Sequence, residues 1–212
     1  MSLLPDNLAD RYRRFKFRHF VPNQDHYEQL ANFGQSPDIM IVSCCDSRVD
    51  PETIFSAMPG ELFVVRNVAN LVPPFETTGK YHGVSAALEF AALNLRVKHI
   101  VIVGHSGCGG IRASLDHEAA RQSEAQFITN WMSMLDAARE QVTAKFAGQP
   151  APAMRAALER EGIKTSLANL RTFPCINTLE SRGRVALHGT HFDIATGTLS
   201  ALNQATGEFV PM

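Results

Sequence analysis

The chain has 212 residues, of which 45% are hydrophobic and 19% are charged, and its formal net charge is −1. This length suits one sizeable core and is short for two domains. The near-zero net charge argues against nucleic-acid and membrane partners, which usually demand a basic excess. No stretch approaches the ~20 apolar residues of a membrane span, and the N-terminus lacks the pattern of a secretory signal. We therefore expect a single-domain cytoplasmic protein with no nucleic-acid and no membrane partner.

The first forty residues have a polar, helical pattern with breaks at Pro22 and at residues 34–37. Between Arg11 and His19, cations alternate with aromatic residues, a pattern that RNA-binding segments also show. The apolar residues follow helical spacing, which favours packing of the rings while the cations stay in water. We expect residues 1–36 to form a helical arm and residues 37–212 to form the core of the domain.

Three short apolar runs, residues 39–42, 62–65 and 99–103, predict buried parallel strands. Apolar residues at helical spacing over 84–95 predict a crossover helix between the second and third strands. Further helical patterns cover 127–135 and 154–170, and residues 185–210 predict one or two strands or a small hairpin at the sheet edge. The alternation predicts an α/β fold with a largely parallel central β-sheet flanked by helices.

Two of the three predicted strands end in residues that bind metals. Cys44 begins the run Cys-Cys-Asp-Ser-Arg after the first strand, and His105 begins His-Ser-Gly-Cys-Gly-Gly after the third. Sites in open parallel sheets form at the carboxyl ends of strands, and neighbouring strands lie ~4.8 Å apart. Two thiolates and one imidazole favour zinc over harder cations. The sequence therefore predicts a Zn²⁺ ion bound by Cys44, His105 and Cys108.

The number of ligands separates catalytic from structural zinc. Structural sites have four protein ligands, whereas catalytic sites have three and leave one position for water. Cys45 follows Cys44 on an extended strand and should point to the opposite face, turned away into packing. Cys175 lies far along the chain and is expected in a core or an interface. The alternative is a non-enzymatic zinc scaffold in which Cys45 or Asp46 fills the fourth position.

Asp46 and Arg48 follow the first cysteine closely enough to act on a zinc-bound water. Asp46 is placed to accept a hydrogen bond from that water, and Arg48 can hold the carboxylate in a bidentate contact that keeps it ionised. A fixed acceptor orients the water so that its lone pair points elsewhere. Either residue alone would fit a surface ion pair or a helix cap. Beside a metal ligand, a catalytic role is favoured.

These motifs resemble those of the β-class carbonic anhydrases. The family pattern Cys-x-Asp-Ser-Arg stands at 44–48, and His-x-x-Cys-Gly-Gly stands at 105–110. Residues 66–74, the segment 34–37 before the first strand, and the late strand at 188–189 are similar as well. The resemblance covers nearly the whole chain.

The resemblance implies a carbonate dehydratase, in which a zinc-bound hydroxide reversibly hydrates carbon dioxide to bicarbonate and a proton. It implies that Gln35 hydrogen-bonds bicarbonate, that Phe63 and Val68 form the apolar lining, and that Gly109 contributes to substrate binding. It further implies a homodimer or a dimer of dimers, with N-terminal helices extending over the partner. An alternative on the same fold is a hydrolase of carbon disulfide or carbonyl sulfide.

The sequence departs from the family at three positions. The family often has Tyr where Phe90 stands, so a pocket hydroxyl is lost. One subgroup has a non-catalytic bicarbonate site that uses a Trp and a Tyr, and here these positions hold Ile41 and Phe192. Arg66 alone cannot supply that site, so we expect this inhibitory switch to be absent.

Overall fold

The computed structural model describes residues 3–116 and 125–212. By its internal contacts the chain divides into two compact units, Met1–Ser36 and Pro37–Met212, which are described separately. The expectation of a single domain stays a prediction.

The N-terminal unit is helical. Its elements are α1 (Asp6–Phe15), the π-helix η1 (Lys16–Phe20), the 3-10 turn η2 (Val21–Asn23) and α2 (Gln24–Phe33). Tyr27 of α2 packs against the last residues of α1 and η1, because its ring centroid lies 4.9 Å from that of Phe20 and 6.3 Å from that of Phe15. Lys16 lies 3.7 Å above the ring of Phe20, and Arg13 remains in solvent. The rings of this basic segment thus pack against one another, as the helical spacing predicts. α1 and α2 bury none of their residues.

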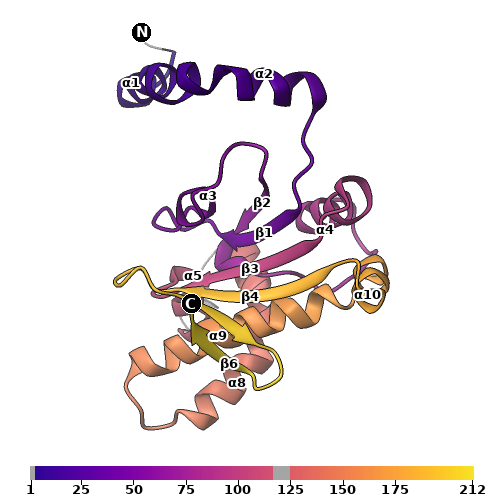
Figure 1. Cartoon of the computed structure of the whole chain (residues 1–212). Coiled ribbons are helices and arrows are strands. Elements are labelled where there is room, and N and C mark those ends of the chain that lie inside the picture. Colours follow the sequence, from indigo (N-terminus) through magenta and orange to yellow (C-terminus); the bar gives the residue numbers. More distant parts are fainter. Residues whose placement is uncertain (1–2, 117–124) are drawn as a thin grey trace. The chain divides into compact units, whose positions relative to one another are not determined.

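The second unit is built on a six-stranded sheet in the order β2-β1-β3-β4-β5-β6 (Figure 1). The strands are β1 (Ile39–Cys44), β2 (Leu62–Asn67), β3 (His99–His105), β4 (Ala186–Phe192), β5 (Leu199–Asn203) and β6 (Glu208–Pro211). The first four are parallel, and β5 and β6 add antiparallel pairs. The largely parallel α/β sheet is confirmed. Residues 185–210 form more of the sheet than the one or two edge strands or small hairpin expected. β4 is an inner strand, and the β5–β6 hairpin follows it at the edge.

Helices connect the strands. In the core unit they are α3 (Pro51–Ile54), η3 (Val68–Asn70), α4 (Gly83–Glu89), the π-helix η4 (Phe90–Leu95), α5 (Gly109–Leu115), α7 (Gln126–Met132), η5 (Ser133–Leu135), α8 (Asp136–Lys145), α9 (Ala151–Leu170) and α10 (Pro174–Ser181). The predicted crossover helix over 84–95 is present as α4 and η4. α10 was not predicted.

The long helix α9 packs closely on the sheet at two glycines. A Cβ atom on Gly104 of β3 or on Gly189 of β4 would lie 2.7 Å from the side chain of Ile163. Even a methyl side chain at either position therefore does not fit unless α9 or Ile163 moves away from the sheet. Ile163 joins Met40 and Ile100 of the sheet in the larger core cluster. This packing holds α9 against β3 and β4.

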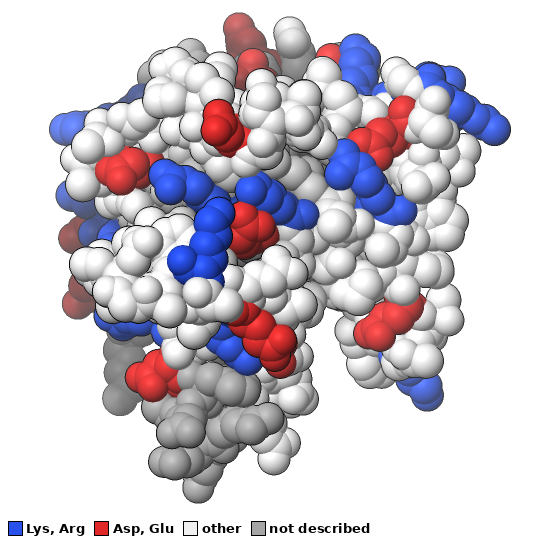
Figure 2. Space-filling view, turned by 90° about the horizontal axis from the view of Figure 1, so that it is seen from below, with Lys and Arg blue, Asp and Glu red and all other residues white. Residues whose placement is uncertain are grey.

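The surface carries both signs of charge. Figure 2 shows acidic and basic side chains side by side over the face seen from below. Such mixing is consistent with a formal net charge of −1. Within the described part of the chain, no helix is both long and apolar enough to cross a bilayer.

Candidate metal centre

The predicted metal ligands lie where the connections of the sheet diverge. β1 is flanked by β2 and β3, so the connection after β1 leads to one side of it and the connection after β2 leads to the other. Cys44 is the last residue of β1, and His105 is the last residue of β3. Open parallel sheets bind ligands at this switch point because the loops part there and leave a crevice.

The three side chains converge on one point. One ligand atom from each of Cys44, His105 and Cys108 lies within 4.8 Å of the other two, and all three residues are buried. The two sulfurs are 3.9 Å apart. Buried thiols and an imidazole at this spacing match the sulfur and nitrogen donors that zinc prefers.

The orientation of His105 fits a metal ligand. Its Nδ1 donates to the carbonyl oxygen of Ser106 at 3.0 Å, which leaves the lone pair of the neutral ring on Nε2. Nε2 is buried and has no hydrogen-bond partner among the described residues. A buried polar atom without a partner is costly unless something else satisfies it. A cation between Nε2 and the two sulfurs would do so, and the site therefore fits zinc.

The two thiols differ in acidity because they share a proton. A hydrogen bond from the Cys108 thiol lowers the pKa of Cys44 to about 4, although burial opposes this. The same contact raises the pKa of Cys108, and burial adds to the increase. Cys44 is thus a thiolate at neutral pH, and Cys108 must lose a proton to bind a metal.

The other two cysteines are outside this group. Cys45 is exposed and lines a cavity beside the site, so the expectation that it is turned into packing was wrong. Cys175 is partly buried and packs against the larger core cluster. Within the described residues, neither belongs to a group of potential metal ligands.

Asp46 and Arg48 form the bidentate pair that the sequence predicts. Asp46 Oδ1 accepts from Arg48 Nε at 2.9 Å, and Oδ2 accepts from Nη2 at 2.7 Å. The backbone N–H of Arg48 donates to Oδ1 as well. These contacts, above all the guanidinium, hold the pKa of Asp46 well below its usual range. Asp46 Oδ2 lies 4.0 Å from Nε2 of His105, so an ionised acceptor stands beside the ligand group.

One glycine lies between the ligands His105 and Cys108, and another lies at the start of α5, just after Cys108. Gly107 has φ +70°, which lets the chain turn tightly between His105 and Cys108. Gly110 lies against Val68, and a Cβ atom there would be 2.7 Å from Val68 Cγ1. Gly107 therefore permits the tight turn, and Gly110 permits the close approach of α5 to Val68.

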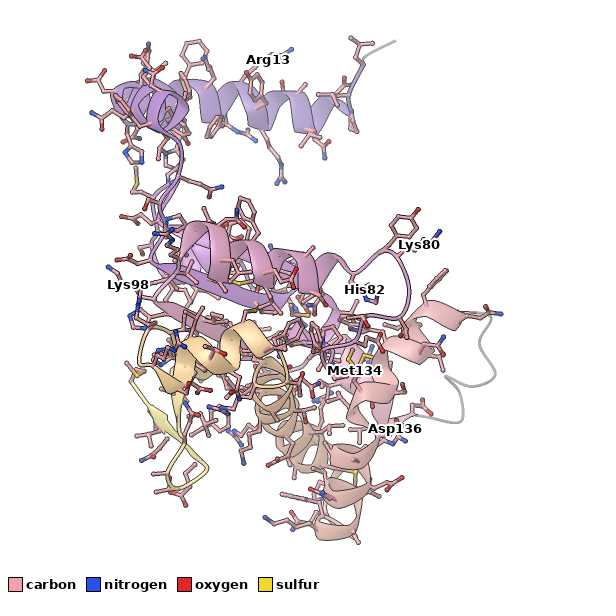
Figure 3. The ribbon with its side chains drawn as sticks, turned by 90° about the vertical axis from the view of Figure 1, so that its right-hand side faces the viewer. Arg13, Lys80, His82, Lys98, Met134 and Asp136 are labelled. Carbon is pink, nitrogen blue, oxygen red and sulfur yellow. The ribbon has the colours of Figure 1, made fainter. Side chains whose placement is uncertain are left out.

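An apolar cavity of about 870 Å³ adjoins the ligand group. Val68 lines it and also packs in the core cluster that contains Cys44 and Cys108. Trp131 fixes this wall, because its Nε1 donates to the carbonyl oxygen of Val68 at 2.8 Å. His82 and Met134, both labelled in Figure 3, line the same cavity although they are far apart in the sequence. Its walls suit an uncharged small molecule.

The remaining predicted substrate residues are more dispersed. Phe63 pairs with Met40 in the sheet, whereas Cys44 pairs with Asn67 at the other end of β2. At about 3.3 Å per residue, this places Phe63 about 13 Å along the strand from the ligand end of its own chain. Gly109 begins α5 directly after Cys108. Gln35 is exposed and belongs to the N-terminal unit.

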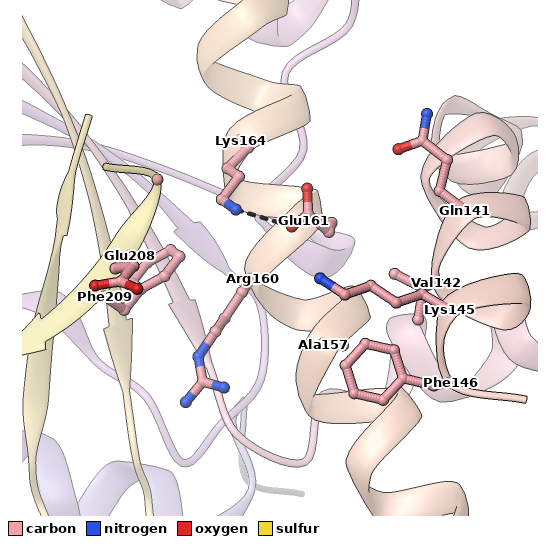
Figure 4. A pocket seen from close by; sticks show the side chains of 11 residues that line it. Gln141, Val142, Lys145, Phe146, Ala157, Arg160, Glu161, Lys164, Glu208 and Phe209 are labelled. Carbon is pink, nitrogen blue, oxygen red and sulfur yellow. Dashed lines mark hydrogen bonds and ion pairs between the residues drawn. The ribbon is translucent and has the colours of Figure 1, made fainter. Parts of the chain in front are cut away.

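A second cavity, of about 560 Å³, lies between α8, α9 and the β5–β6 hairpin (Figure 4). Its lining holds the cations Lys145, Arg160 and Lys164 and the carboxylates Glu161 and Glu208. Lys164 and Glu161 form an ion pair at 2.9 Å. None of the predicted metal ligands or substrate residues lines this cavity, so it does not form part of the candidate metal site.

Glu159 is the residue of the metal centre that sequence reasoning missed. It lies on α9, is buried, and accepts hydrogen bonds from the backbone N–H groups of Gly107 and Cys108. One signal was available in the sequence. Leu158 and Ile163 belong to the apolar face of this helix, and an acidic residue on a buried face needs partners.

Comparisons with known proteins agree with this geometry. Residues 39–199 match the family model described as carbonic anhydrase. The chain belongs to the carbonic anhydrase family, and to its β class, as the motifs predict.

Individual relatives extend the match. The chain is 33% identical over 194 residues to beta carbonic anhydrase 6, mitochondrial, of Arabidopsis thaliana, covering 92% of this chain and 66% of that protein. It is 31% identical to the β-carbonic anhydrase CcaA, with a TM-score of 0.91 over 97% of this chain and 98% of the other. A tetrameric β-carbonic anhydrase of Sordaria macrospora is 27% identical, with a TM-score of 0.67 over 93% of each chain.

Proposed function

We propose that this protein reversibly hydrates carbon dioxide to bicarbonate and a proton at a zinc ion held by Cys44, His105 and Cys108. One observation carries the proposal. Three buried ligand atoms lie within 4.8 Å of one another, and the group contains no fourth ligand among the described residues. Catalytic zinc sites have this open composition, whereas structural ones are closed.

The bound zinc would supply a nucleophile by lowering the pKa of a coordinated water. Asp46 would accept a hydrogen bond at the reacting oxygen, because its carboxylate is ionised and held beside His105. Arg48 would keep that carboxylate from rotating, since two of its nitrogens grip both oxygens. Val68 and the apolar cavity would receive the uncharged substrate and exclude part of the water.

Three further residues complete the proposed substrate site. Gly109 would contact the bound substrate at the start of α5. The space beside its Cα is open, because a Cβ atom built there has no neighbour in this chain within 4 Å. Gln35 would donate a hydrogen bond to bicarbonate. Phe63 would act at the site of a partner chain, because it lies at the far end of β2 from its own Cys44.

The proposed assembly is a homodimer or a dimer of dimers. The wall residues Tyr81 and Phe127 are 96% and 94% exposed, which is unusual for large aromatic side chains beside an apolar cavity. The N-terminal unit exposes Leu8, Tyr12 and Phe17 as well. We propose that residues 1–36 form an arm that extends over a partner, and the tetrameric Sordaria relative supports self-association.

The family match favours hydration over the two alternatives, a carbon disulfide or carbonyl sulfide hydrolase and a zinc scaffold. The compartment is less constrained. A cytoplasmic location stays a prediction, because the Arabidopsis relative is named as mitochondrial and the chain spans only 66% of its length.

A stopped-flow hydration assay tests the proposal directly. Zinc-loaded protein should accelerate the hydration of carbon dioxide, a chelator should abolish the acceleration, and added zinc should restore it. Protein that retains one zinc per chain but gives no acceleration would contradict the proposal. The same preparation assayed with carbonyl sulfide and carbon disulfide would then identify the hydrolase alternative.

A further inference from the structure

Glu159 is a buried acidic residue close to the metal centre. Its side chain is 3% exposed and lies on the face of α9 that packs against the core. Acidic side chains are almost never fully buried unless they are paired, because removing the charge from water is costly. The contacts of Glu159 must therefore compensate for its burial.

The carboxylate of Glu159 joins three parts of the fold. Oε1 accepts from the backbone N–H of Gly107 at 2.8 Å and from that of Cys108 at 3.2 Å. Oε2 lies 3.3 Å from Nε2 of His191 on β4, which donates to it. Arg155, one turn earlier on α9, places Nε 4.0 Å from Oε1. α9, β4 and the ligand loop are thereby tied to a single side chain.

Gly107 is held from both sides. Its N–H donates to Glu159, and its carbonyl oxygen accepts from Nη2 of Arg48 at 3.1 Å. The same Nη2 donates to Asp46. The N–H of Cys108 belongs to the same peptide group as this carbonyl and also donates to Glu159, so a chain of hydrogen bonds runs from Glu159 through the Gly107–Cys108 peptide group and Arg48 to Asp46.

Consecutive N–H groups that point at one anion define the orientation of the peptide planes between them. The plane between Gly107 and Cys108 contributes to the direction of the Cα–Cβ bond of Cys108, from which its sulfur extends. Gly107, at φ +70°, belongs to the residue type with the greatest backbone freedom. A loop of this kind needs an external contact to stay in one conformation.

We propose that Glu159 is a positioning residue of the metal centre. It holds the Gly107–Cys108 peptide so that the Cys108 sulfur faces the metal and the Gly107 carbonyl faces Arg48. This rests on the metal-binding role of Cys44, His105 and Cys108, and it does not depend on which reaction the metal supports. Residues behind the ligands typically change metal affinity by about 10- to 100-fold when removed.

The test compares zinc affinity in three variants. Glu159→Ala removes both acceptor oxygens, and Glu159→Gln keeps the volume and one acceptor. Glu161→Gln is the matched control, because it makes the same chemical change two residues along α9, where the carboxylate is partly exposed and bonds Lys164. The dissociation constant for zinc is measured by competition with a chromophoric chelator. The visible spectrum of the cobalt-substituted protein reports the geometry of the thiolate ligands.

We expect Glu159→Ala to weaken zinc binding by about 10- to 100-fold and to alter the cobalt spectrum. Glu159→Gln should give a smaller loss, and Glu161→Gln should match the unsubstituted protein. A folded Glu159→Ala variant with unchanged affinity and spectrum would overturn the proposal, as would an equal loss in Glu161→Gln.

Circular dichroism shows whether each variant is folded. If Glu159→Ala fails to fold, the isosteric Glu159→Gln variant is used instead. Weaker zinc binding with an altered cobalt spectrum in this variant supports the positioning role. An unchanged zinc dissociation constant and an unchanged spectrum overturn it. A purely structural role would lower the melting temperature of the metal-free and zinc-loaded forms equally. Positioning instead shrinks the increase in melting temperature that zinc produces. Because no readout uses carbon dioxide, failure of the hydration activity would leave this test intact.

Discussion

Arg48 holds Asp46 through two parallel hydrogen bonds, Nε to Oδ1 at 2.9 Å and Nη2 to Oδ2 at 2.7 Å. Such a fork-to-fork contact fixes both the position and the plane of the carboxylate. The pair therefore supplies an acceptor with one orientation beside the ligand group.

Replacing Asp46 with Asn should separate metal binding from turnover. The amide keeps the shape but presents a donor at one of its two positions, so it no longer acts only as an acceptor. We expect zinc content to remain at one per chain, and kcat/KM for hydration to fall by about 10- to 100-fold. Stopped-flow kinetics and elemental analysis of the same sample measure both. Full activity in this variant would refute the role of the pair.

Asp50→Asn is the matched control for that experiment. Asp50 receives the N–H of Thr53 at the start of α3 and contacts Arg66, and it is not part of the ligand group. The asparagine can still cap the helix. Its activity should stay near that of the unsubstituted protein.

Loss of one ligand should remove zinc and its stabilising effect together. Cys44→Ser and His105→Ala each leave two protein ligands, and both should purify without zinc and without hydration activity. In the unsubstituted protein, free zinc at 100 times its dissociation constant should add about 2.7 kcal/mol to the free energy of unfolding. Thermal denaturation with and without zinc measures this difference. An equal stabilisation in Cys44→Ser would contradict the assigned ligands.

Zinc binding should release protons. Above about pH 5, Cys44 is already a thiolate because the Cys108 thiol lowers its pKa to about 4. Cys108 has a raised pKa and keeps its proton until the metal displaces it. Zinc affinity should therefore fall as the pH is lowered, since protons compete for the same sulfur. Calorimetry at pH 8 in buffers of different ionisation enthalpy counts the protons, and a count of zero would contradict this reading.

Bicarbonate should inhibit hydration without cooperativity. Ile41 is buried in β1 and Phe192 packs in the cluster beside the ligands, so neither position offers a hydrogen-bonding side chain. Arg66 already donates to the carbonyl oxygens of Cys44 and Val49. Steady-state inhibition should follow a simple hyperbola. A sigmoidal dependence on bicarbonate would show that a second bicarbonate site exists.

The fold and the ligands were predictable because their signals are local. The apolar runs that became β1 and β3 end directly in the ligand motifs, and strand ends meet at one edge of a parallel sheet. The inner position of β4 was not predictable in this way. Its parallel pairing with β3 is made through a long connection, and alternating character alone does not separate inner strands from edge strands.

Glu159 was missed for a related reason. Its partners Gly107 and Cys108 lie 52 and 51 residues earlier in the chain, and no spacing rule links an acidic residue on a helix to a loop that distant. The exposure of Cys45 was misjudged because the strand ends at Cys44, after which the alternation of faces no longer applies.

The glycines beneath α9 set how closely this helix packs on the sheet, and that distance affects both the packing of the core and the position of Glu159. Ile163 rests against Gly104 and Gly189, and Glu159 stands one helical turn before it. A methyl group added at Gly189 would push the helix outward and draw the carboxylate away from the ligand loop. A substitution on β4, remote in sequence from every zinc ligand, would thus loosen the core and the grip on the ion at the same time.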